Sequence, residues 1–136
     1  MQLQNMRILV IDDSEVMLVY IRESLKSIGI KKIRIVKNGK AALEILKSST
    51  ELNDHRFMYN LIICDWLMPD MSGLEVLKQI KSNKDMSDIP FIMLTSVKER
   101  EMVSEAIAAG VSSYILKPFT ADTLYEKIEI INSKGK

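Results

Sequence analysis

Residues 61–69 read Leu-Ile-Ile-Cys-Asp-Trp-Leu-Met-Pro. Four apolar residues in a row that end in a carboxylate are typical of a strand buried on both faces. Pro69 stops the strand because it has no backbone N–H to donate, and Ser72-x-x-Glu75 then forms the capping box of a following helix. The stretch therefore predicts a buried strand that delivers Asp65 to a loop, where it can act as a nucleophile or a metal ligand.

Short apolar runs of this kind occur four more times along the chain. They predict strands at Arg7–Ile11, Ile33–Val36, Phe91–Leu94 and Tyr114–Leu116. Apolar residues at helical spacing follow each strand, which predicts five helices. The alternation implies an α/β fold, with a parallel sheet and helices on both faces joined by right-handed crossovers. Lys32 and Arg34 place the second strand at an edge of the sheet, because charges there prevent unwanted pairing.

Capping residues mark where the helices begin and end. Ser14 and Thr120 are placed to cap the first and last helices, and Gly29 stands where a residue just past a helix belongs. Asn38-Gly39 leads into the second helix. Ser48 to Met58 then reads as a polar loop, longer than the roughly 2–6 residues usual for such a connection.

Size and composition predict a single domain over residues 1–136, with no output domain. Hydrophobic residues make up 47% of the chain and charged residues 27%, which is ordinary for a globular protein. The formal net charge is +1 and the Lys and Arg residues are scattered, so we expect neither nucleic acid nor a membrane surface as a partner. A monomer is the expected state.

Cysteine usage and the first residues bear on location. Cys64 is the single cysteine, which excludes an internal disulfide and favours a reducing compartment. Residues 1–5 are polar and lead directly into a strand, so we expect no signal peptide. No apolar stretch approaches the roughly 20 residues that span a bilayer. These features predict a cytoplasmic protein.

Polar residues follow or end four of the five strands. They are Asp12 and Asp13 after the first, Asp65 at the end of the third, Thr95 after the fourth and Lys117 after the fifth. In an open parallel sheet the ligand site lies beyond the carboxyl ends of the strands, at the switch in strand order. If the first and third strands flank that point, the three carboxylates face one another.

Three carboxylates at short range do not all stay ionised without compensation. Two unit charges ~5 Å apart repel by roughly 3 kcal/mol at an effective dielectric of about 20. Either a proton or a divalent cation relieves the repulsion, and oxygen-only ligands in an open site favour Mg²⁺. Lys117 adds a positive charge and Thr95 a hydroxyl, which together suit a phosphoryl group. The set predicts a phosphoryl-transfer site with a carboxylate nucleophile.

In this order, Asp12-Asp13, Asp65, Thr95 and Lys117-Pro118 resemble the pattern of receiver domains in two-component response regulators. The chain is similar over essentially its whole length to single-domain chemotaxis regulators of the CheY type, above all in residues 65–69 and 114–120. The resemblance implies a flavodoxin-like (βα)5 doubly wound three-layer sandwich. Its parallel five-stranded sheet has the order 2-1-3-4-5, which is the known order of CheY itself.

The resemblance also implies a role for each site residue. A histidine kinase donates a phosphoryl group to Asp65, and Lys117 contacts the phosphoryl oxygens. The cofactor Mg²⁺ is held by Asp13 and Asp65 directly, by Asp12 largely through water, and by the backbone carbonyl of Leu67.

A switch pair completes the implied site. Thr95 hydrogen-bonds the phosphoryl group, and Tyr114 turns inward into the space left behind. The Lys117-Pro118 peptide is expected to be cis, an isomer that only proline adopts at low cost.

The implied function is that of a signalling switch and not of a turnover enzyme. Phosphorylation changes a face made of helix 98–109, the fifth strand and the last helix, and this face binds a partner such as a flagellar switch component in chemotaxis. A phosphatase is a further candidate partner. The alternative is a phosphorelay intermediate that passes the phosphoryl group to a second histidine. Trp66, interpreted as a lid over the metal site, and Tyr114 favour chemotaxis.

Two residues beside the site depart from the CheY pattern. Leu67 stands where CheY has Asn, and Val97 where it has Glu. The carbonyl of Leu67 remains available to a metal, but neither side chain can orient a water molecule. We therefore predict slow hydrolysis of the aspartyl phosphate.

Two other classes fit the fold less well. A haloacid-dehalogenase-type phosphatase needs a second Asp two residues after its nucleophile, where this chain has Leu67. A flavodoxin-like flavin site needs a Ser/Thr-rich phosphate loop after the first strand, where Asp12-Asp13 repels a phosphate.

Overall fold

The sheet has five parallel strands in the order β2-β1-β3-β4-β5, as the CheY-like resemblance implied. The computed structural model describes residues 1–96 and 100–134. The strands are β1 (Arg7–Ile11), β2 (Lys32–Val36), β3 (Leu61–Asp65), β4 (Phe91–Thr95) and β5 (Ser113–Leu116). As predicted, β2 is an edge strand, and β5 forms the other edge.

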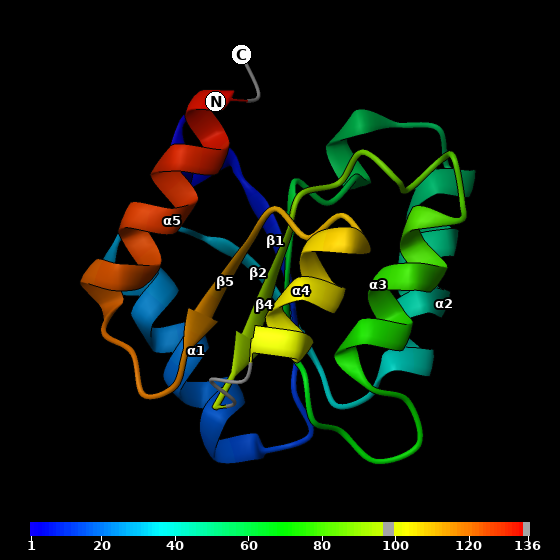
Figure 1. The fold of residues 1–136 in the computed structure, drawn as a ribbon. Coiled ribbons are helices and arrows are strands. Elements are labelled where there is room, and N and C mark those ends of the chain that lie inside the picture. The colour runs from blue at the N-terminus through cyan, green and yellow to red at the C-terminus, as the bar shows by residue number, and fades with distance from the viewer. Residues whose placement is uncertain (97–99, 135–136) are drawn as a thin grey trace.

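Five α-helices cover the sheet in two layers. They are α1 (Glu15–Ser27), α2 (Gly39–Glu51), α3 (Gly73–Lys81), α4 (Arg100–Ala108) and α5 (Ala121–Lys134), with short 3₁₀ turns η1 (Leu3–Asn5) and η2 (His55–Phe57). Helices α1 and α5 lie on one face of the sheet, and α2, α3 and α4 lie on the other (Figure 1). The fold is therefore the predicted three-layer sandwich. No helix in the described ranges is long and apolar enough to cross a membrane.

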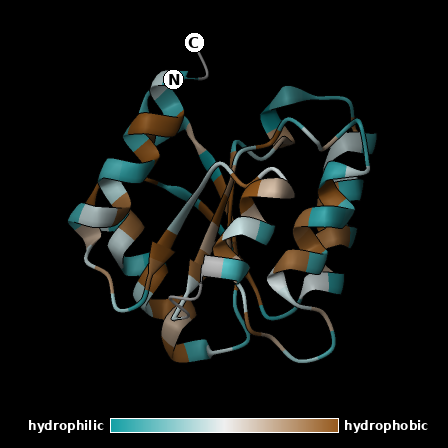
Figure 2. Cartoon of the chain, in the orientation of Figure 1, coloured by the Kyte–Doolittle hydropathy of each residue, from teal (hydrophilic) through white to brown (hydrophobic). Residues whose placement is uncertain are grey.

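Side chains of the central strands alternate between two cores. Leu9 and Ile62 pack into the core under α2 and α3, whereas Ile8 and Ile63 pack into the core under α1 and α5. All five residues of β3 and of β4 are buried. Hydrophobic residues accordingly gather along the strands and on the helix faces that meet them (Figure 2). Burial on both faces explains why these strands read as continuous apolar runs.

The predicted caps are present at the helix ends. The Ser14 side chain accepts a hydrogen bond from the Met17 amide, and Ser72 accepts one from the Glu75 amide. Thr120 Oγ1 accepts from the Thr123 amide at the start of α5. Gly29 has φ of +100°, the left-handed conformation expected just past a helix.

The prediction of a loop from Ser48 to Met58 was wrong in its first part. Helix α2 continues to Glu51, and η2 occupies 55–57. Ser49 is buried and its hydroxyl donates to the Leu46 carbonyl, and Thr50 bonds the Lys47 carbonyl in the same way. The helix continues because its buried face, which includes Leu46, extends to Ser49 at helical spacing.

Candidate functional site

The strand register brings the polar strand ends to one edge of the sheet. Ile11 pairs with Cys64, Asp65 with Leu94, and Thr95 with Leu116. The residue that follows or ends each of these strands therefore lies at the same level. This alignment places Asp12, Asp13, Asp65, Thr95 and Lys117 at the carboxyl end of the sheet, with β1 and β3 adjacent, as the sequence predicted.

Three carboxylates meet at this edge. Asp12 is fully buried, Asp65 is 7% exposed and Asp13 is exposed. Each offers one oxygen, and these three atoms lie within 4.8 Å of one another. Two oxygens on opposite sides of a bound Mg²⁺ are about 4.2 Å apart. The spacing thus fits a magnesium ion with one carboxylate bound through water, and an all-oxygen donor set is what this ion prefers.

Lys117 supplies the positive charge that the cluster needs. Its Nζ donates to Asp65 Oδ1 at 2.7 Å and to Asp12 Oδ2 at 3.4 Å. Its own amide donates to the Thr95 carbonyl at 2.9 Å, which fixes the start of the loop after β5. The following peptide, Lys117-Pro118, is cis, as predicted. The ammonium therefore bridges the ends of β1 and β3 from the end of β5, which lies two strands beyond β3 in the sheet.

The pKa values of Asp65 and Lys117 each depend on the charge of the other residue. Burial, together with the charges of Asp12 and Asp13, raises the pKa of Asp65 although the Lys117 ammonium lowers it. For Lys117, burial lowers the pKa, but the hydrogen bond and charge of Asp65 outweigh burial and the net pKa is raised. Ionised Asp65 thus depends on a nearby cation.

The two residues expected to form the switch occupy different environments. Thr95 is 2% exposed at the end of β4. The side chain of Tyr114, on the edge strand β5, is 37% exposed. Tyr114 therefore does not fill the site in this structure. Leu67 directs an apolar side chain outward beside the site, with 59% exposure, and Val97 lies outside the described residues.

Trp66 does not form the lid that the sequence suggested. It is 4% exposed and packs in the core under α2 and α3. Its amide donates to the Leu94 carbonyl and its carbonyl accepts from the Gly73 amide. These backbone bonds hold the residue next to the end of β3, with its side chain in the core. Trp66 is a packed aromatic next to Asp65 and not a cover over the three carboxylates.

Gly73 is a site residue that the sequence interpretation missed. A Cβ built on Gly73 lies 2.3 Å from the backbone carbonyl oxygen of Asp65 and 2.8 Å from Met93 Sδ. The N-terminus of α3 therefore approaches the end of β3 so closely that only glycine fits. A glycine directly after the cap residue Ser72 was the available signal.

Comparisons with known proteins agree with this geometry. The family model described as response regulator receiver domain matches residues 8–129. Chemotaxis protein CheY-3 of Vibrio cholerae is 35% identical over 128 residues, covering 94% of this chain and 92% of that protein. Chemotaxis protein CheY1 of Helicobacter pylori is 35% identical over 126 residues, covering 93% and 96%. The crystal structure of CheY4 from Vibrio cholerae superimposes with a TM-score of 0.81 at 25% identity, covering 93% and 98%.

Proposed function

Since this chain belongs to the response regulator receiver domain family, whose members are signalling switches and not turnover enzymes, we propose that it accepts a phosphoryl group on Asp65 from a histidine kinase. The observation that carries the proposal is the contact between Lys117 Nζ and Asp65 Oδ1, 2.7 Å long, within the cluster of three carboxylates. We further propose that this receiver domain acts as a monomer in the cytoplasm.

The site residues divide the chemistry among themselves. A carboxylate oxygen of Asp65 attacks the phosphorus of a phosphohistidine, the P–N bond breaks, and the imidazole leaves as the new P–O bond forms. Lys117 exchanges its contact with Asp65 for one with the phosphoryl oxygens. The groups that would hold Mg²⁺ are Asp12, Asp13, Asp65 and the Leu67 carbonyl. The ion would neutralise the negative charge that develops on the phosphoryl oxygens.

The switch converts this charge into a change of surface. A phosphoryl group adds about −1.5 to −2 charge at neutral pH. The Thr95 hydroxyl moves to donate to it, and Tyr114 turns from its exposed position toward the vacated space. Because Tyr114 lies on β5, between α4 and α5 in the surface, the change reaches the face formed by these three elements.

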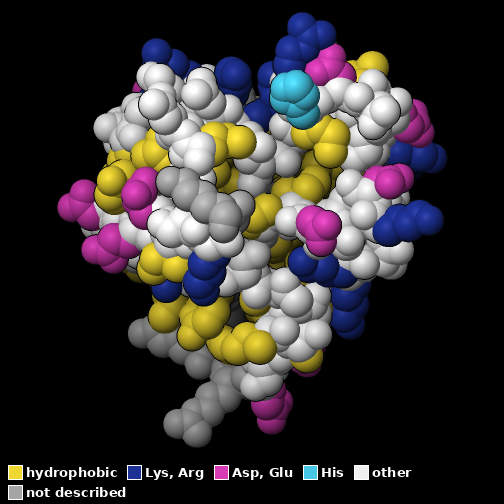
Figure 3. Space-filling model, turned by 90° about the horizontal axis from the view of Figure 1, so that it is seen from above, with side chains coloured by type: hydrophobic (Ala, Val, Ile, Leu, Met, Phe, Trp, Pro, Cys, Tyr) yellow, Lys and Arg dark blue, Asp and Glu magenta, His cyan; other side chains and the backbone are white. Residues whose placement is uncertain are grey.

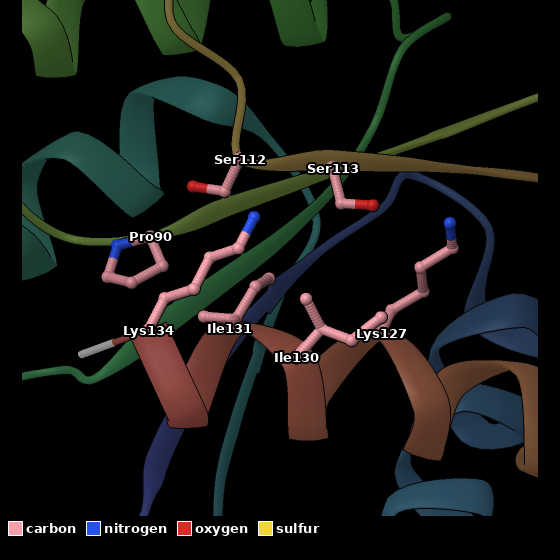
Figure 4. Close-up of a pocket in the computed structure, with 7 residues that line it drawn as sticks. All are labelled: Pro90, Ser112, Ser113, Lys127, Ile130, Ile131 and Lys134. Atoms are coloured by element: carbon pink, nitrogen blue, oxygen red, sulfur yellow. The ribbon is translucent and has the colours of Figure 1, made fainter. Parts of the chain in front are cut away.

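This face carries the features of a docking surface. Its exposed large hydrophobic residues are Ile107, Tyr114, Leu116, Tyr125 and Ile130. Below them, a cavity of about 480 Å³ lies between β5 and α5, and Lys127 and Lys134 extend over it from the helix toward Ser112 and Ser113 (Figure 4). Apolar side chains beside two cations suit a partner segment with acidic residues. Because the relatives are chemotaxis proteins, we propose that the partner bound by this face is a flagellar switch component.

Acetyl phosphate tests the proposed acceptor directly. With Mg²⁺, the wild type is expected to gain the mass of one phosphoryl group, measured by intact-protein mass spectrometry, and to lose it on treatment with hydroxylamine. Without Mg²⁺, or in Asp65→Asn, no such gain is expected. Asp85→Asn is a matched control on an exposed loop and leaves the gain intact. A phosphorylated Asp65→Asn would contradict the assignment.

Leu67→Asn is expected to shorten the lifetime of the aspartyl phosphate about tenfold. An exposed Asn amide beside Asp65 can orient an attacking water, whereas the Leu67 side chain offers no polar atom. Holding the attacking water in the right orientation can accelerate hydrolysis by at least about tenfold. The decay of phosphorylated protein is followed after removal of acetyl phosphate. Leu67→Met keeps the side chain apolar and serves as the control, and equal lifetimes for Asn and Leu would refute the prediction.

Added Mg²⁺ is expected to raise the melting temperature in the absence of any phosphoryl donor. A ligand that binds only the folded state stabilises it, and the ion relieves repulsion among Asp12, Asp13 and Asp65. Differential scanning fluorimetry across a Mg²⁺ titration measures the shift. Asp13→Asn is expected to weaken it, whereas Asp70→Asn, outside the cluster, retains it. A Mg²⁺-independent melting temperature would argue against the metal site.

A phosphorelay role is the second candidate, and one surface feature favours it. Val16, Tyr20, Pro118 and Phe119 line an apolar cavity of about 350 Å³ close to Lys117, and Val16 is 82% exposed. An apolar surface next to the acceptor suits a helix that carries the reacting histidine. Transfer of the phosphoryl group from Asp65 to a histidine phosphotransfer domain would support this role, and binding of a flagellar switch protein to the phosphorylated form would support chemotaxis.

A further inference from the structure

A second pocket of about 550 Å³ lies apart from the phosphoacceptor site. It is formed by β1, β2, one face of α2 and the segment around η2. Its lining includes Arg7, Arg34, Glu44, Leu52, Phe57 and Tyr59. Arg7 begins β1, whereas Asp12 follows the end of that strand, and the two sites share no lining residue. We call it the Arg34 pocket.

Two guanidinium groups belong to residues that line this pocket, and neither pairs with a carboxylate in the part of the chain that the structure describes. Arg34 is exposed on the edge strand β2, and no carboxylate in residues 1–96 or 100–134 forms an ion pair with it. Arg7 is held in place, because its Nη2 donates to the Arg56 carbonyl at 3.0 Å and its guanidinium lies 6.0 Å from the centre of the Tyr59 ring. Neither contact neutralises the charge of Arg7. The Arg7 Nε is also buried without a hydrogen-bond partner.

Apolar groups lie beside these cations. Leu52 is 60% exposed and Phe57 is 45% exposed, and both belong to the segment that joins α2 to β3. These side chains offer apolar surface to a ligand with a flat apolar part. The Arg56 guanidinium lies over the Phe57 ring, 5.7 Å from its centre, so a ligand would use the other face of that ring. Glu44 also lines the pocket and supplies a carboxylate that accepts hydrogen bonds from hydroxyl or amino groups.

Two cations, a partly exposed ring and a carboxylate can each bind one part of the same kind of molecule. Arginine forks bind phosphate oxygens, aromatic side chains stack on a purine base, and a carboxylate accepts from ribose hydroxyls. An inorganic anion uses the cations alone and leaves the exposed ring and Glu44 without a role. We propose that the Arg34 pocket binds a nucleotide, with its phosphate on Arg7 and Arg34 and its base against Phe57. This site is independent of phosphorylation at Asp65.

The chain offers a matched pair of variants on one strand. Lys32 and Arg34 are both cations on β2, but only Arg34 lines the pocket. AMP is titrated into the full-length protein by isothermal calorimetry, with adenosine and inorganic phosphate as partial ligands. We expect saturable AMP binding, and binding at least tenfold weaker for each partial ligand. Arg34→Gln is expected to weaken AMP binding about tenfold, whereas Lys32→Gln leaves it unchanged.

Amide NMR spectra locate the binding and verify the fold of each variant. Shifts confined to the lining residues, including Glu44 and Phe57, support the proposal. No saturable binding of AMP in the millimolar range overturns it. Phosphate that binds as tightly as AMP, or an affinity equal in Arg34→Gln and wild type, also overturns it, because the pocket is then an unspecific anion site or is not used.

Discussion

Gly73→Ala is expected to lower the free energy of unfolding by about 3 kcal/mol, the upper range for overpacking. The added Cβ would lie 2.3 Å from the Asp65 carbonyl oxygen, a backbone atom that has no side-chain freedom to move aside. The Gly73 amide donates to the Trp66 carbonyl at 2.8 Å, so the helix cannot withdraw without losing that bond. A shift of β3 away from α3 moves the acceptor carboxylate, so phosphorylation of Asp65 is also expected to slow.

Urea denaturation and the rate of phosphorylation by acetyl phosphate measure the two effects of Gly73→Ala. Gly29→Ala is the control, because Gly29 has a φ of +100° but open space around its Cβ position. Strain in that conformation costs about 1–2 kcal/mol, and the phosphorylation rate is expected to stay unchanged. A Gly73→Ala protein as stable and as reactive as wild type would show that the contact between α3 and β3 is adjustable.

The site was predictable from the sequence because parallel strands with buried faces are uniformly apolar. Each strand could be located, and the polar residue that ended it was then forced to the carboxyl edge of the sheet. Asp12, Asp65 and Lys117 met for this reason, although no pair of them is closer than 52 residues apart in the chain. The strand order came from family resemblance, since periodicity alone does not rank one order of parallel strands above another.

The features that the sequence did not reveal depend on contacts between distant elements. Trp66 was interpreted as a lid because it follows the acceptor in a loop, but the core under α2 and α3 has room for its ring. The close approach of Gly73 to Asp65 depends on where α3 enters the sheet. The Arg34 pocket likewise requires two strands, the end of α2 and η2 to be placed together.

Figure 3 shows how charged and hydrophobic side chains are distributed on one face of the molecule. Because both signs of charge occur there, composition alone predicted no binding surface. On the face that Figure 3 shows, Lys and Arg side chains alternate with Asp and Glu, and hydrophobic side chains lie between them. The formal net charge of +1 reflects this mixture. Folding brings together charges that are distant in the sequence, as at the acidic cluster and in the Arg34 pocket.

Lys117→Met is expected to lower the free energy of unfolding by about 2–3 kcal/mol at neutral pH without Mg²⁺. The variant keeps a side chain of similar length but removes the cation that contacts Asp65 and Asp12, both of which are buried. Two carboxylates close together in the protein interior are then uncompensated. Lys37→Met is the control, because Lys37 also pairs with a carboxylate, that of Glu15, but both side chains are exposed and little change is expected.

The pH dependence distinguishes this mechanism from a simple loss of packing. Burial already raises the pKa of Asp65, so the native state binds more protons than the unfolded state just above the usual Asp pKa of about 4. The contribution of Asp65 to stability therefore falls as the pH rises through that window. Without Lys117 the pKa of Asp65 rises further, and the loss extends to higher pH.

We therefore expect Lys117→Met to have a lower free energy of unfolding than wild type, by a difference that grows with pH. Urea denaturation in the presence of EDTA, between about pH 5 and pH 8, measures this difference. Lys117 itself stays protonated throughout, because Asp65 holds its pKa above the ordinary value against the effect of burial. Adding Mg²⁺ should recover part of the deficit, since a divalent cation among the same carboxylates replaces the missing charge. A deficit that is constant with pH and unaffected by Mg²⁺ would mean that Lys117 contributes through packing and not through its charge.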